Sequence, residues 1–87
     1  MAYKVAILPS ALRQLADLPR PDQKRVANKI DRLSADPRPP GAKKLQTDRD
    51  LYRLRVGKYR VIYAVEDVRL TVLVVRVGHR REVYRGV

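Results

Sequence analysis

The chain has 87 residues, of which 20 are Lys or Arg and 9 are Asp or Glu, so its formal net charge is +11. A chain of this length predicts one domain, residues 1–87, whose small core leaves no room for a deep small-molecule pocket. The lack of cysteine and the single histidine, His79, argue against disulfides and against a metal or cofactor site. No apolar stretch approaches the roughly 20 residues of a membrane span, so we expect a cytoplasmic protein. The positive charge predicts an anionic partner, either nucleic acid or an acidic protein.

The first half of the sequence predicts a strand followed by a helical hairpin. Residues 3–8 form a β-prone run that ends at Pro9. Ser10 is a suitable N-cap for a short helix, whose apolar positions are Leu12, Leu15 and Leu18. Residues 21–36 predict a longer amphipathic helix with a basic outer face, whose apolar positions are Val26, Ile30 and Leu33. The Pro-rich residues 36–41 cannot continue that helix and predict a surface linker.

A β-hairpin is the clearest local structure in the second half. Residues 51–56 and 59–65 alternate as strands, and Gly57-Lys58 between them is a two-residue turn with glycine at the first central position. The turn sets the register, so Arg55 faces Arg60 and Arg53 faces Ile62 across the pair.

The segments on either side of the hairpin complete the predicted fold. Lys43 and Lys44 form a basic loop before it. Residues 70–77 are a nearly continuous apolar run, which predicts a strand at the sheet centre covered on both faces. From Gly78 onward the sequence predicts a polar tail without strand alternation. The expected class is therefore α+β: an N-terminal strand, a helical hairpin, and a three-stranded antiparallel meander.

Period-two alternation places Arg53, Arg55 and Arg60 on one face of the hairpin. Like charges directly opposite each other in a ladder cost on the order of 0.2–1 kcal/mol, and no carboxylate is available at these positions. A fold does not need this arrangement, so an anion-binding site is the preferred interpretation. The alternative is a solvated arginine face.

The tail adds residue types that could complete such a site. Arg80 and Arg81 can bind phosphate bidentately, and Tyr84 can stack on a base or exchange a proton. His79 is the one histidine, the residue type that most readily exchanges protons at physiological pH. The alternatives are that Tyr84 packs to tie down the C-terminus and that His79 is a surface histidine without a role.

Three stretches of the sequence resemble the RelE/ParE superfamily of type II toxins: residues 2–5, residues 51–63 and residues 77–84. The resemblance spans nearly the whole chain and implies a compact microbial RNase-like fold. RelE-like members cut messenger RNA in the ribosomal A site. ParE-like members inhibit DNA gyrase and generally lack the catalytic basic residues and the terminal tyrosine. Because this sequence keeps both, the resemblance is to the RelE-like branch.

The resemblance also implies roles for particular residues. Arg53 and Arg55 match two basic residues of the family's second strand, where lysine is common, and arginine is a poorer proton shuttle than lysine. Arg60 matches a phosphate-binding arginine, and Arg80 matches the basic residue beyond the last strand, although a gap leaves Arg81 as the alternative. The candidate catalytic residues are Arg55, Arg60, Arg80 and Tyr84. The candidate RNA-binding residues are Arg53, Lys43, Lys44, His79 and Arg81.

The activity implied by the family is a metal-independent endoribonuclease that leaves a 2′,3′-cyclic phosphate and a 5′-hydroxyl. The implied partners are a cognate antitoxin, the ribosome and messenger RNA, with operator DNA reached only through the antitoxin complex. Two alternatives stay open, a gyrase inhibitor of the ParE type and a plain nucleic-acid-binding module.

Overall fold

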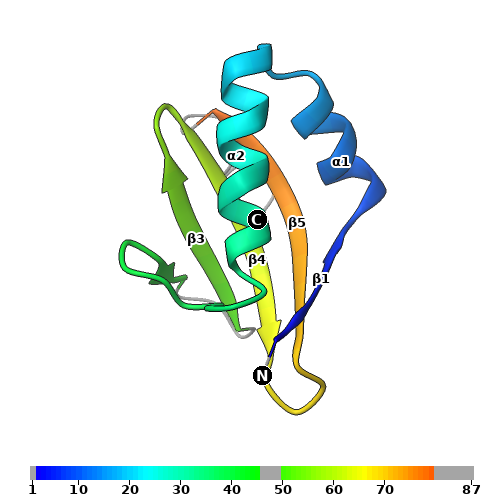
Figure 1. Cartoon of the computed structure of the whole chain (residues 1–87), viewed down its shortest axis with the longest axis vertical. Coiled ribbons are helices and arrows are strands. Elements are labelled where there is room, and N and C mark those ends of the chain that lie inside the picture. Colours follow the sequence, from blue (N-terminus) through cyan, green and yellow to red (C-terminus); the bar gives the residue numbers. More distant parts are fainter. Residues whose placement is uncertain (1, 46–49, 80–87) are drawn as a thin grey trace.

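The computed structural model describes residues 2–45 and 50–79, which form two helices packed on one face of a five-stranded sheet (Figure 1). In chain order the elements are β1 (Lys4–Ile7), α1 (Pro9–Ala16), α2 (Arg20–Arg32), β2 (Lys43–Lys44), β3 (Leu51–Val56), β4 (Tyr59–Glu66) and β5 (Thr71–His79). The strand order is β1-β5-β4-β3-β2. Strand β1 runs parallel to β5, and the other neighbouring pairs are antiparallel. The α+β class and the β3-β4-β5 meander are as predicted.

The β3-β4 hairpin has the predicted register, with Val56 opposite Tyr59 and Arg55 opposite Arg60. Gly57 has φ +60°, whereas Lys58 has no positive φ, which is the pattern of a type II′ turn. Glycine is favoured at position 57 because a side chain there would have to adopt the left-handed region.

The two faces of the sheet have different chemistry. The face toward the helices carries the core, which includes Leu54, Val56, Val61, Tyr63, Val65, Val72, Val74 and Val77. Tyr63 is fully buried, and its hydroxyl donates a 2.8 Å hydrogen bond to the carbonyl of Pro37. Burial raises the pKa of Tyr63 to about 12, so its phenol stays protonated and keeps donating at neutral pH. This bond anchors the start of the linker after α2 to the centre of the sheet.

The structure corrects the prediction for the first helix. Ser10 is not its N-cap, because α1 begins at Pro9 and Leu8 is the capping residue. Proline is well suited to the first helical turn, since its missing N–H would have no intrahelical partner there. Ala11 and Leu15 are the buried positions, whereas Leu12 is 54% exposed. The second helix is also shorter than residues 21–36, because it ends at Arg32.

The strands after the linker differ from the prediction in three ways. Lys43 and Lys44 are not a loop but form β2, which pairs with β3. Strand β5 extends through Gly78 and His79, because both residues keep partners on β4. Strand β5 lies inside the sheet, between β1 and β4, but its burial alternates, so only the predicted cover of both faces was wrong.

Beyond the end of β1, helix α1 contacts the edge of β5 that β1 leaves unpaired. Strand β1 pairs with β5 only as far as Val74. Beyond that point the Val77 N–H donates 2.8 Å to the Gln14 side-chain oxygen. A helix side chain thereby satisfies a strand donor that has lost its neighbouring strand. In the described residues, neither helix is long and apolar enough to cross a membrane.

Candidate functional site

The strands β2, β3 and β4 bring four cationic side chains together on the face of the sheet opposite the helices. Lys43 pairs with Arg53, and Arg55 pairs with Arg60, so all four belong to one face. They line a hollow of about 240 Å³ together with Gly41. We call these five residues the arginine hollow.

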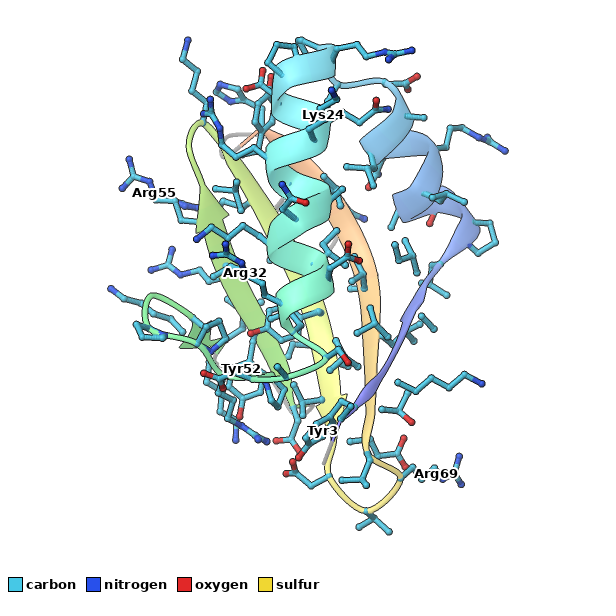
Figure 2. The ribbon with its side chains drawn as sticks, viewed as in Figure 1. Tyr3, Lys24, Arg32, Tyr52, Arg55 and Arg69 are labelled. Carbon is cyan, nitrogen blue, oxygen red and sulfur yellow. The ribbon has the colours of Figure 1, made fainter. Side chains whose placement is uncertain are left out.

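The arginine hollow is a site for a polyanion by its charge and its geometry. Its described lining holds four cations and no carboxylate. Arg55 is exposed and projects beyond the outer side of β3 (Figure 2), whereas Arg53 and Arg60 are partly buried. A guanidinium held at a strand position offers two parallel donors to the oxygens of one phosphate. Such a set can hold a phosphate diester and stabilise extra negative charge on it.

The structure places two of the sequence candidates away from this hollow. Lys44 pairs with Tyr52, which packs against the core, so Lys44 lies on the helix side of the sheet. Its Nζ is 3.1 Å from an Asp50 carboxylate oxygen. His79 is opposite Tyr59, and their rings meet edge to face with centroids 6.1 Å apart.

The position of Tyr59 decides the side on which His79 lies. Tyr59 packs against the core and its hydroxyl donates 3.3 Å to Asp22 of α2, so His79 lies on the helix side with it. The remaining candidates, Arg80, Arg81 and Tyr84, lie outside the described residues.

One arginine that the sequence reasoning did not select lies on the same face as the hollow. Arg76 of β5 is opposite Ile62 of β4, and Ile62 is opposite Arg53 of β3, so the two arginines flank Ile62 from either side of β4. A register shift between Ile62 and Tyr63 allows this arrangement. The signal in the sequence is a change in spacing, because the buried valines follow at 72 and 74 and then at 77.

A second polar cluster holds the loop that forms one wall of the hollow. Arg38 donates to both carboxylate oxygens of Asp67, at 3.1 and 2.8 Å, and its Nε donates 2.8 Å to the Tyr52 hydroxyl. Tyr3 donates 2.7 Å to the same carboxylate. We call Tyr3, Arg38, Tyr52 and Asp67 the Arg38 clasp. Figure 2 shows Tyr3 and Tyr52 at the end of the sheet away from the hairpin turn.

The Arg38 clasp connects four separate parts of the chain. It joins the segment before β1, the linker after α2, strand β3 and the β4-β5 turn. The linker then leads through Gly41 to Lys43, which both line the arginine hollow. The clasp therefore helps to set the position of this wall relative to Arg53 and Arg55.

The clasp makes stability depend on pH in the acid range. Hydrogen bonds from Arg38 and then from Tyr3 hold the pKa of the Asp67 carboxyl below its usual value. A lowered native pKa stabilises the fold above the ordinary carboxyl pKa of about 4, and this contribution is lost as the pH falls through the lowered value. We expect Asp67→Asn to lower the melting temperature at neutral pH, and the difference from wild type to shrink below about pH 4.

Melting curves over a pH series measure this effect. Glu66→Gln is the matched control, because Glu66 is the neighbouring acid and pairs with Arg69 at 3.2 Å on an exposed turn. Such an exposed pair contributes little. A difference for Asp67→Asn that stays constant down to about pH 2 would contradict the assigned role of its charge.

Comparisons with known proteins identify the family. The protein-family model for the ParE toxin of the type II toxin-antitoxin system parDE matches residues 5–84. The RelE1 toxin of Methanocaldococcus jannaschii is 30% identical over 89 residues, covering 99% of each chain. Toxin RelG of Mycobacterium tuberculosis is 31% identical, covering 98% of this chain and 99% of the relative. The chain is a RelE-like toxin of the RelE/ParE superfamily. It is thus the toxin of a type II toxin-antitoxin system.

Solved structures of RelE proteins share the fold of this RelE-like toxin. The toxin-antitoxin complex RelBE2 of Mycobacterium tuberculosis matches with a TM-score of 0.80 and 30% identity, covering 92% of this chain and 100% of the other. The archaeal RelE-RelB complex of Pyrococcus horikoshii also has a TM-score of 0.80 and 30% identity, covering 94% and 99%. The isolated Escherichia coli RelE toxin matches at 0.78 with 26% identity, covering 90% and 84%.

Proposed function

We propose that this RelE-like toxin is a metal-independent endoribonuclease that cleaves messenger RNA in the ribosomal A site. The observation that carries the proposal is the arginine hollow, in which four cations from three strands converge and no described carboxylate joins them. A cationic lining attracts phosphate and repels a divalent metal ion. The similarity of this chain to RelE toxins in sequence and structure supports the same proposal.

The proposed reaction is an attack of a ribose 2′-hydroxyl on the adjacent 3′-phosphate. The 2′-oxygen loses its proton and forms a bond to phosphorus, and the bond to the 5′-oxygen of the next nucleotide breaks. The products are a 2′,3′-cyclic phosphate and a 5′-hydroxyl, whose oxygen has gained a proton. Arg60 and Arg55 bind the pentacoordinate phosphate, where negative charge builds up. Arg53 and Lys43 bind neighbouring phosphates.

The chain beyond β5 supplies the other proposed groups. Arg80, or Arg81 in its place, neutralises the leaving oxygen, and Tyr84 stacks on a base or assists proton removal. Two sequence candidates bind RNA only from outside the hollow in this proposal. Lys44 stands beside Asp50 at the sheet edge, and His79 stands at the end of β5.

Primer extension on messenger RNA after induction of the toxin tests the nuclease. Breaks in phase with codons, together with 5′-hydroxyl ends, are the expected result. The matched family model describes ParE toxins, which keeps a gyrase inhibitor as the second candidate. Gyrase-dependent DNA damage without messenger breaks would establish that candidate instead. Nucleic-acid binding with neither effect would leave a plain binding module.

The proposed protein partner is a cognate antitoxin. RelE proteins of Mycobacterium tuberculosis and Pyrococcus horikoshii are found in complexes with their antitoxins. A net charge of +11 on 87 residues favours a partly acidic, initially disordered segment that wraps the domain. In this proposal the toxin acts in the cytoplasm and reaches operator DNA only through the antitoxin complex.

A further inference from the structure

Helix α2 carries a row of cations that the proposed reaction does not use. Arg25, Lys29 and Arg32 follow at i, i+4 and i+7, so they lie on one side of the helix. All three are exposed, and none forms an ion pair with an acid of the described residues. We call them the α2 row. Figure 2 shows Arg32 on the side of α2 that faces β3.

Among the described residues, no acid of α2 forms an ion pair with this row. Asp22 is at the start of the helix and accepts a hydrogen bond from Tyr59. Asp31 is one position before Arg32, which turns it about 100° away around the helix, onto the side of Lys24. The row therefore presents three positive charges over about 10 Å of helix length.

The β3-β4 turn joins the α2 row to the arginine hollow. A Cβ atom at Gly57 would lie 3.5 Å from the Arg25 Nη1, so that guanidinium touches the turn from the helix side. From the opposite face of the sheet, the Arg55 Nε donates a long 3.5 Å hydrogen bond to the Gly57 carbonyl. Lys58 adds an exposed positive charge at the tip of the same turn. Arg55 and Arg25 thus meet at one residue, although they belong to opposite faces of the sheet.

We propose that RNA bound in the arginine hollow continues around the β3-β4 turn and along the α2 row, held through its phosphates. This inference rests on the proposed function, because the hollow is taken as the site that holds the scissile phosphate. A span of about 10 Å is long enough to contact more than one phosphate of a strand, since even along the axis of a duplex the phosphates of one strand are about 3.4 Å apart. The hollow then performs the reaction, and the row holds the flanking RNA.

Helix α2 exposes no large hydrophobic side chain, which favours RNA over an acidic protein as the occupant of the α2 row. Stable protein interfaces have an apolar core with buried anchors. The large hydrophobic residues that the described chain exposes are Leu8, Leu12 and Val68. They belong to α1 and its cap and to the β4-β5 turn, and none is on α2. A phosphate backbone needs only the charges that the row presents.

The test compares two double variants that each remove two positive charges. Arg25→Gln/Arg32→Gln alters the α2 row, and Lys4→Gln/Arg13→Gln alters exposed cations of β1 and α1. The probes are 2′-O-methyl oligouridylates, which cannot be cleaved. The short probe has three nucleotides, and the long probe has about twelve, which is within the site sizes of single-strand binders. Affinities are measured over a salt series, and melting curves confirm that both variants are folded.

We expect the row variant to bind the longer probe about tenfold more weakly than the control variant, with equal binding of the trinucleotide. Two lost phosphate contacts reduce the slope of log affinity against log salt by about 1.4 for a single strand. Lys29→Glu, which reverses one charge of the same row, should also weaken binding of the longer probe and leave binding of the trinucleotide unchanged. Equal slopes for the row and control variants would overturn the proposal. So would weaker binding of an acidic antitoxin with unchanged RNA binding, which would assign the row to a protein.

The outcome is separate from that of the proposed function. Primer extension with the wild-type toxin decides whether it cleaves messenger RNA, whereas the two probes measure binding without cleavage. This inference alone would be overturned if the wild-type toxin cleaves messenger RNA and the row variant shows no selective loss of affinity for the longer probe. If codon-phased breaks are absent, the nuclease fails first, whatever the probes show.

Discussion

Arg60→Ala is expected to abolish messenger cleavage while the toxin stays folded. Arg60 lies directly opposite Arg55 and lines the arginine hollow, where the proposed transition state carries extra negative charge. Losing one preorganised donor to such a charge typically costs about 10²–10³ in rate. A guanidinium that offers two donors and a full charge belongs at the upper end of this range.

The fold should tolerate the loss of Arg60. Its side chain is on the face of the sheet away from the core, so its removal leaves no core cavity. It also removes a cross-strand repulsion with Arg55, on the order of 0.2–1 kcal/mol. We therefore expect the melting temperature to stay close to that of the wild-type toxin.

Single-turnover cleavage on programmed ribosomes, together with thermal melting, measures both parts of this expectation. Arg53→Ala is the informative comparison, because Arg53 is opposite Ile62 and farther from the turn, and should affect binding more than the chemical step. Arg69→Ala is the remote control, since Arg69 is exposed on the β4-β5 turn and pairs with Glu66. Full cleavage by a folded Arg60→Ala toxin would show that the arginine face is only a solvated surface.

The hairpin could be predicted from the sequence because its causes are local. A glycine that can adopt a positive φ, followed by one residue and flanked by two alternating runs, specifies both the turn and the register. Once the register is known, alternation places Arg53, Arg55 and Arg60 on one face. The centre of the candidate site therefore follows from about ten consecutive residues.

The parts that could not be predicted depend on distant segments of the chain. Lys43-Lys44 is too short to show alternation, and it becomes a strand only because the edge of β3 is available. The parallel pairing of β1 with β5 joins segments more than 60 residues apart, for which no local pattern exists. The register shift at Ile62 and Tyr63 is needed to assign Arg76 to its face. His79 was expected in a tail, and its strand pairing with Tyr59 places it on the helix side instead.

The largest effect that we expect is the dependence of cleavage on the ribosome. The described part of the arginine hollow offers cations, which bind phosphate, but no carboxylate, imidazole or phenol that could accept the 2′-hydroxyl proton. Because the proposal assigns proton removal to Tyr84 alone, we expect rate enhancement to depend strongly on geometry, and holding the 2′-oxygen in line with the scissile bond can supply effective molarities of about 10⁵–10⁸ M. A ribosome that holds the codon in this conformation provides such positioning, whereas free RNA samples it rarely.

We expect the toxin to bind ribosome-free messenger with a steep salt dependence but to cleave it at least about 10³-fold more slowly than messenger in programmed ribosomes. Single-turnover assays with the same messenger in both states measure the ratio, and the Arg60→Ala variant gives the background. Equal rates in the two states would mean that the toxin positions the RNA by itself, and the ribosome would have no place in the mechanism.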